Sequence, residues 1–157
     1  MATTVAEMNV DYPVLSYKYE VSFDDAEWGG KEGNAAAFSE VSGLSIEYES
    51  VVYEDGVNGR RQLPGKIALV SLSIKRGIVR QRDALFQWIN SSHTADFKKR
   101  NMVIVLKDLE DKPVATWNVM GAFPKKLDAP SFNAGSNEVA IESLDLTADR
   151  LSITYEE

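Results

Sequence analysis

Hydrophobic and polar residues alternate strictly between Leu15 and Phe23, a pattern that predicts a β-strand with one buried face. A shorter alternation follows at Leu44 to Glu49, and apolar residues fill most early positions from Ile67 to Ile74. The pattern at Leu44 to Glu49 is typical of a half-buried strand, and the pattern at Ile67 to Ile74 is typical of a strand covered on both sides. We expect Leu44 to Glu49 and Ile67 to Ile74 to pair as a hairpin.

The C-terminal half contains further strand patterns. Asn101 to Leu109 and Val114 to Met120 predict a second hairpin around a turn with Pro113, since a proline cannot donate a ladder hydrogen bond. Prolines and a glycine predict an irregular crossover from Ala122 to Ser136. Two last strands are expected at Asn137 to Leu146 and at Leu151 to Tyr155.

One segment has helical spacing. Leu85, Trp88 and Ile89 share one face of a short helix that we expect between Arg80 and Asn90. About seven strands and one helix leave too little helix for parallel βαβ units. The predicted fold is therefore mainly β, a single domain over residues 1–157 in which antiparallel strands form a sandwich or barrel.

The connection from Glu54 to Gly65 is longer than an ordinary hairpin loop of roughly 2 to 5 residues. Val57 and Leu63 lie among its charges, which favours a loop docked on a surface over a disordered one. Its acidic pair and its basic pair flank a glycine-bearing tip, and Pro64-Gly65 favours a tight turn. The candidate interface residues are Glu54, Asp55, Gly56, Val57, Asn58, Gly59, Arg60, Arg61, Leu63, Pro64 and Gly65.

Charge and composition narrow the possible functions. Acidic residues outnumber basic ones by 24 to 17, for a net charge of −7, which disfavours nucleic-acid binding as the main task. Isolated basic pairs in an acidic chain can instead complement the acidic patches of an identical neighbour. Absence of cysteine fits assembly in a reducing cytoplasm and equally suits a protein that must later survive oxidising surroundings. We expect neither a secretion signal nor a membrane span.

No catalytic, cofactor or metal site is predicted. A cysteine nucleophile is impossible, and His93 is the one histidine, expected at a helix end. Asp108 to Asp111 lacks the spacing of a calcium loop, and Glu47 and Glu49 are expected to face solvent. The exposed aromatic Trp28 leaves open a monomeric β-sandwich that binds carbohydrate or another ligand.

Several motifs occur together in a fixed order. They are FSEVSGLSIEYESVVYEDGVNG with LPG and IKRG, LFQWINS (Leu85 to Ser91), TWNV (Thr116 to Val119), AFPKKL (Ala122 to Leu127), APSFNAGSNEVAIE (Ala129 to Glu142) and ADR (Ala148 to Arg150). In this order they resemble the inner tube proteins of contractile phage tails, and most of all those of extracellular contractile injection systems such as antifeeding prophages and virulence cassettes. The stretch from Asp24 to Ala37 is longer than the family's usual connection.

The resemblance implies a tail-tube-like subunit that assembles into stacked hexameric rings inside a contractile sheath. Sheath contraction would drive this tube through a target envelope to deliver protein cargo, or DNA if the particle is a phage. The implied partners are further copies of the chain, the sheath, the baseplate and spike, and a terminator, with a membrane contacted only as the traversed target. The particle would be made in the bacterial cytoplasm and released. Glu54 to Gly65 is then the candidate contact to a neighbouring subunit or ring.

Overall fold

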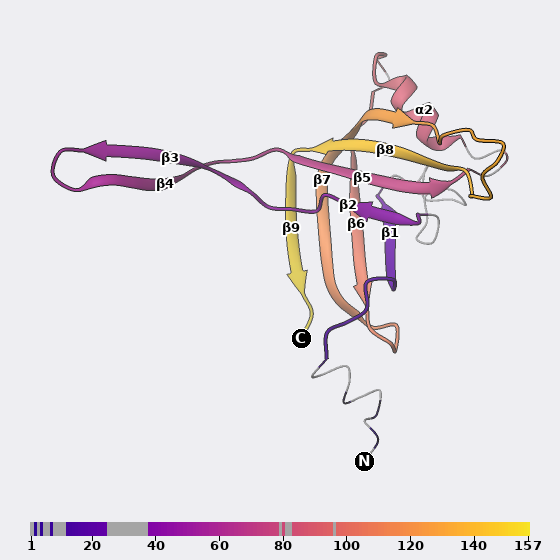
Figure 1. The fold of residues 1–157 in the computed structure, drawn as a ribbon, viewed down its shortest axis with the longest axis horizontal. Helices are drawn as coiled ribbons and strands as arrows, with labels where there is room; N and C mark the ends of the chain where they lie inside the picture. The colour runs from indigo at the N-terminus through magenta and orange to yellow at the C-terminus, as the bar shows by residue number, and fades with distance from the viewer. Residues whose placement is uncertain are drawn as a thin grey trace.

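The computed structural model describes residues 2, 4, 7, 12–24, 38–78, 80, 83–95 and 97–157. Figure 1 shows a body of crossing strands from which one long hairpin projects. The described elements are β1 (Tyr19–Phe23), β2 (Glu40–Ser42), β3 (Tyr48–Asp55), β4 (Gly59–Ile67), β5 (Val70–Gly77), α2 (Ala84–Ser91), β6 (Arg100–Lys107), β7 (Pro113–Asp128), β8 (Ile141–Ala148) and β9 (Arg150–Tyr155).

The long strand β7 belongs to two antiparallel layers. Its first half pairs with β6 on one side and β9 on the other, which gives the layer β1-β6-β7-β9. Its second half pairs with β8, which gives the layer β2-β5-β8-β7. The strands of the two layers run crosswise, as in orthogonal sandwiches whose corners are formed by strands that pass from one sheet to the other (Figure 1).

The corner between the layers lies where Gly121 of β7 meets Asp149, the residue between β8 and β9. The Asp149 N–H donates to the Met120 carbonyl at 3.0 Å. Gly121 has a φ of 67°, and a Cβ placed there would collide with the Asp149 carboxylate. The same carboxylate accepts a salt bridge from Lys99 at 3.1 Å. Glycine is therefore required at this corner for both its backbone conformation and its lack of a side chain.

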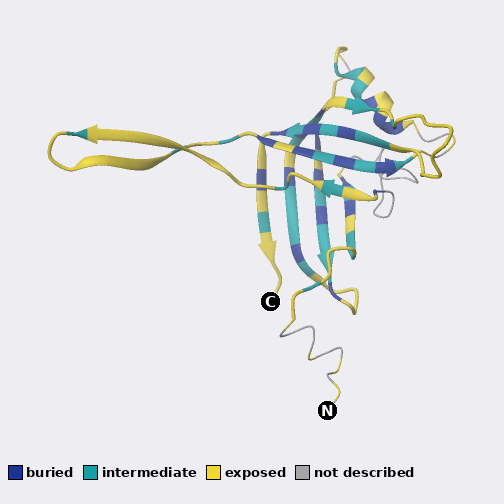
Figure 2. Ribbon diagram, viewed as in Figure 1, coloured by how far each residue is buried: buried dark blue, intermediate teal, exposed yellow. Residues whose placement is uncertain are grey.

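The core lies between the layers and under the helix, as the dark blue residues of Figure 2 show. Cross-strand rows such as Val21, Ile104 and Trp117 point inward together. Trp88 of α2 is 1% exposed, and its indole N–H donates to the Lys98 carbonyl at 3.0 Å. The alternation along each body strand thus becomes one buried face, since alternate side chains point to opposite sides of a sheet.

Several sequence predictions are confirmed. The chain is mainly antiparallel β, and the helix forms with Leu85 and Trp88 buried. The hairpin of β6 and β7 is present, and so are the two C-terminal strands β8 and β9. Strand β8 begins at Ile141. The N-terminal strand is shorter than predicted, since it begins at Tyr19. Within the described residues the layers keep free edges, so they form a sandwich and do not close into a barrel.

The predicted hairpin of Leu44–Glu49 with Ile67–Ile74 is wrong. Residues 43–47 are not in a strand, and β3 begins at Tyr48 and pairs with β4. The strand β5 pairs instead with β2 and β8. It also alternates, with Leu72 and Ile74 buried and Ser71 exposed, so it is not covered on both sides.

The two predicted proline breaks are also wrong in part. Pro64 lies inside β4 and Pro124 inside β7, so Ala122 to Asp128 is strand and the irregular crossover covers residues 129–140. Each proline stands in a stretch that pairs on one side among the described residues, next to a shift in register. A proline lacks the backbone N–H group, and at the edge of a sheet no neighbouring strand is present to accept a hydrogen bond from that position. Trp28 lies outside the described residues.

Candidate assembly surfaces

The hairpin β3–β4, residues 48–67, which we call the arm, forms a separate two-stranded sheet. It projects from the body along the longest axis of the molecule, and most of its residues are exposed (Figures 1 and 2). Two-stranded hairpins are marginally stable in water unless a further layer covers them. The exposed arm is therefore a candidate surface for contact with another molecule.

The two faces of the arm differ in chemistry. On one face Val51 lies opposite Leu63 and Tyr53 lies opposite Arg61. We call these four residues the apolar face, and all three of its apolar side chains are more than half exposed. The other face places Val52 opposite Gln62 and Glu54 opposite Arg60, and we call it the polar face. Such a division is typical of a strand pair that buries one side.

The tip of the arm is a short turn stabilised by Asp55. The Asp55 carboxylate accepts the backbone N–H groups of Val57 at 2.9 Å and Asn58 at 2.6 Å, and these bonds lower the pKa of Asp55 below its ordinary value of 3.8. Gly59 closes the turn with a φ of 74°. Val57 is 92% exposed at the outermost point. An aliphatic tip of this kind is suited to insertion against another surface.

The predicted interface residues all lie in the arm, but not as a loop. Glu54 and Asp55 end β3, residues 56–58 form the turn, and Gly59 to Gly65 belong to β4. The acidic pair and the basic pair do not act as two separate units. Glu54 lies 4.0 Å from Arg60 across the hairpin, and Asp55 stabilises the turn. Arg61 has no ion-pair partner among the described residues, so it is the charge available on the apolar face.

Sequence reasoning missed Val51 and Tyr53, which supply much of the apolar face. The signal for a short hairpin was present in Asp55-Gly56 and Asn58-Gly59, dipeptides that favour tight turns between strands. Had these been taken as the turn, the strands on either side would have been placed correctly.

The body has free strand edges as well. In the layer β1-β6-β7-β9, β1 pairs with β6 and β9 pairs with β7, so each strand has one side without a partner in the described part of the chain. The other layer ends at β2, a strand of 3 residues. A free edge exposes unpaired backbone N–H and C=O groups, which readily pair with another chain.

The residues considered for chemistry are separate from one another. His93 is exposed just beyond the end of α2, and Glu47 and Glu49 are exposed. Asp108 accepts the N–H groups of Glu110 at 2.8 Å and Lys112 at 3.0 Å, which stabilises the β6–β7 turn. Within the described ranges no group of three or more potential metal ligands occurs, and no helix there is both long and apolar enough to cross a bilayer.

Comparison with known proteins identifies the family. Residues 15–152 match the family model of the T4-like virus tail tube protein gp19. A search among curated proteins gave no significant match.

Solved structures of tube complexes match almost the whole chain. The extended sheath-tube complex of PVC, an extracellular contractile injection system, contains a chain that is 33% identical, with 99% of this chain and 100% of that chain covered and a TM-score of 0.85. A chain of the tube-terminating cap of the anti-feeding prophage is 30% identical over 99% and 100%, with a TM-score of 0.83. Hcp1 from Flavobacterium johnsoniae is 12% identical over 89% and 97%, with a TM-score of 0.51, and shares the fold alone. The chain belongs to the T4-like virus tail tube protein family and is a structural tube subunit of the contractile injection system type.

Proposed function

We propose that the chain assembles into hexameric rings, and that these stack into the rigid inner tube of an extracellular contractile injection system. The observation that supports this most directly is the arm, a hairpin with an exposed apolar face that no other part of the described chain covers. Its role is to join neighbouring copies. In this role the candidate interface residues, Glu54 to Gly65 apart from Gln62, act together with Val51 and Tyr53.

Ring closure occurs by pairing of the free edge of β9 with the free edge of β1 on the next copy. These strands have 6 and 5 residues, so they match in length. They are opposite edges of one layer, as a head-to-tail ring requires. Edge β2 of the other layer is shorter, and short edge strands are a known device against pairing.

In such a ring the outward face of the layer β1-β6-β7-β9 becomes the channel wall. This face carries a row of Ser22, Val103, Asn118 and Ser152 and a row of Glu20, Val105, Thr116 and Thr154, and Met120 lies opposite Arg150 beyond them. Glu20 is paired with Lys107. These residues together carry only a small net charge, which limits adhesion of charged protein cargo during passage.

The function is mechanical and not enzymatic. Sheath contraction drives the tube through a target envelope, and the partners of the chain are a sheath, a baseplate and a terminator. The matches to chains from a sheath-tube complex, a terminating cap and a baseplate support these partners. The tube belongs to a phage tail-like particle that acts outside the producing cell.

Electron microscopy of the purified protein tests this function, with rings and tubes as the expected result. A variant in which residues 52–62 are replaced by the dipeptide Asn-Gly, so that a two-residue turn links Val51 to Leu63, should unfold at the temperature of the original chain but form no tubes. Normal tubes from this variant would show that the arm is not a joint. A purified protein that stays a monomer of 17.4 kDa would contradict the tube function itself.

A further inference from the structure

A second exposed apolar surface lies on the crossover of residues 129–140 and the strand ends beside it. Phe132 is 85% exposed and Val139 is 77% exposed, and Ile141, which lines the same hollow, is also exposed. The Ile78 N–H donates to the Ala140 carbonyl at 3.0 Å, which holds the crossover against the end of β5. We call Phe132, Val139 and Ile141 the end patch. The crossover residues form a hollow of about 720 Å³ beside it.

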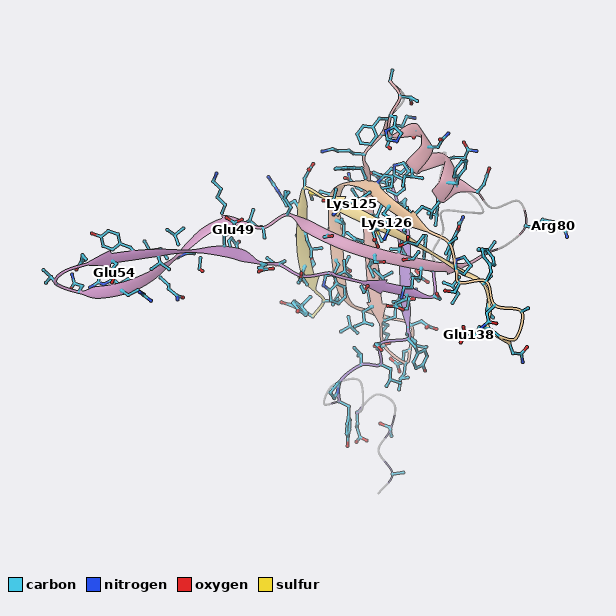
Figure 3. All side chains as sticks on the ribbon, turned by 45° about the horizontal axis from the view of Figure 1, so that its top comes forward. Glu49, Glu54, Arg80, Lys125, Lys126 and Glu138 are labelled. Carbon is cyan, nitrogen blue, oxygen red and sulfur yellow. The ribbon has the colours of Figure 1, made fainter. Side chains whose placement is uncertain are left out.

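The end patch and the arm lie at opposite ends of the molecule. Figure 3 shows Glu54 of the arm at one end of the longest axis and Glu138, which adjoins the end patch, at the other. The free edge of β9 is on the arm's side of the body, and the free edge of β1 is on the side of the end patch (Figure 1). A ring closed by pairing β9 with β1 therefore directs each arm toward the end patch of the next copy.

The arm is long enough to reach it. Strand β3 has 8 residues, which span about 26 Å at the usual rise of a strand. A layer of four strands is only about 15 Å across from first strand to last. The arm can thus pass the β9 edge and lie over the near end of a neighbouring body.

Charge on the two surfaces is complementary. Arg61 is part of the apolar face of the arm, and Glu138 directly precedes Val139 of the end patch. Within the described part of the chain neither side chain forms an ion pair. A guanidinium and a carboxylate brought together at the rim of an apolar contact form charge-assisted hydrogen bonds and fix its orientation.

Another apolar hollow, lined by Tyr12, Leu15 and Leu109 among others, is a poorer receptor. It measures about 200 Å³, smaller than the hollow at the crossover. Its lysines are already neutralised, because Lys18 pairs with Asp111 at 2.9 Å and Lys107 pairs with Glu20. It also lies near the ends of β1 and β6, away from the direction in which the arm projects (Figure 1).

We propose that the apolar face of the arm of one copy seats on the end patch of the next copy in the same ring, with Arg61 facing Glu138. This inference rests on the proposed ring and names the receptor for its arm. The contact is heterologous, so every copy both gives an arm and receives one.

Disulfide trapping tests the contact, since the sequence contains no cysteine. Assembled protein with Leu63→Cys and Val139→Cys should give a ladder of covalent multimers on mild oxidation, up to a closed hexamer, which reducing agent removes. Gln62→Cys with Val139→Cys places the thiol on the polar face and should give at least tenfold less product. Leu63→Cys with Leu109→Cys tests whether the arm seats in the smaller hollow instead.

Each outcome separates this inference from the proposed function. Tubes that form without the Leu63–Val139 ladder, or that give a Leu63–Leu109 ladder, overturn the receptor and leave the tube function in place. Equal ladders from Gln62 and Leu63 overturn the assignment of the face. If the unaltered chain makes no rings at all, the proposed function fails and this contact fails with it.

Charge reversal gives an independent measurement. Arg61→Glu and Glu138→Lys should each raise the protein concentration needed for assembly by about tenfold, and the two together should restore it. Arg60→Glu combined with Glu138→Lys is the control, because Arg60 lies on the polar face, and this pair should show no rescue. Absence of rescue in the Arg61–Glu138 pair would overturn their contact.

Discussion

In the body, Leu144 and Leu146 of β8 are fully buried, whereas in the arm Val51 and Tyr53 of β3 alternate in the same way and are more than half exposed. Both regions are antiparallel strands with matched cross-strand pairs. The difference is that the body strands have a second layer to pack against and the arm has none within the described chain. Alternation thus identifies the apolar face of a strand, but it does not say whether the same chain covers that face.

This comparison predicts the largest loss of stability in the body. Leu146→Ala should lower the free energy of unfolding by about 2–5 kcal/mol, since it removes buried methyl groups and leaves a cavity. The matched change in the arm, Leu63→Ala, should lower it by less than about 1 kcal/mol because that side chain is already exposed. Denaturant unfolding of both variants measures this. Similar losses would mean that the arm is packed in the isolated subunit.

The corner of the body should be the next most sensitive position. Gly121→Ala should destabilise the subunit by about 1–3 kcal/mol, because alanine is strained at a positive φ and its Cβ meets Asp149. Adding Asp149→Ala should recover part of the loss by removing the collision, while the backbone strain remains. A Gly121→Ala subunit as stable as the original would show that the corner adjusts freely.

On the arm, a substitution on the apolar face should impair tube formation without destabilising the subunit, whereas one on the polar face should affect neither. Leu63→Ser should change the free energy of unfolding by about 0.5 kcal/mol or less but reduce tube formation strongly. Gln62→Ser on the polar face should leave both nearly unchanged. Sedimentation of assembled protein, together with thermal unfolding of the subunit, measures the two quantities. If the two variants assembled equally well, the faces would not differ in function.

The smallest expected effect is at the tip of the arm. Because the folded-state pKa of Asp55 is lowered by the N–H groups of Asn58 and Val57, its contribution to the turn is fully present above the ordinary pKa of 3.8. It is lost as the pH falls through the lowered value. The protection of the Val57 and Asn58 amides against hydrogen exchange, taken relative to the intrinsic exchange rate at each pH, should therefore fall only in that acidic range. Asp55→Asn should remove this pH dependence. A pKa of Asp55 at or above 3.8, measured by NMR titration, would contradict the prediction.

Sequence reasoning succeeded where one period dominated and the partner was close in the chain. The helix from its i, i+3, i+4 spacing and the β6–β7 hairpin around a short turn are examples. It failed at Leu44 to Glu49 because alternation there does not identify the partner strand, and β5 pairs with segments far along the chain. The prolines of β4 and β7 were wrongly predicted to interrupt strands, because a strand tolerates proline only where it lies at the edge of a sheet, and the sequence does not show which strands are edges.

For the candidate site, the sequence predicts a segment of the chain but not its shape. Length and mixed charge select Glu54 to Gly65 as the candidate interface, and this range lies within the arm. The division into an apolar and a polar face depends on register, which pairs Tyr53 with Arg61 and Glu54 with Arg60. A shift of one residue would exchange the faces, so the distinction requires the structure.

The strand β7 also determines how the subunit responds to force. Its 16 residues form hydrogen bonds first within one layer and then within the other, and β8 and β9 follow it around the corner. Sliding one layer over the other would require many backbone hydrogen bonds to break at once, since they lie side by side along a continuous strand. A load applied to one layer therefore passes directly through the covalent chain into the other. We therefore expect the two layers to move together as one rigid unit.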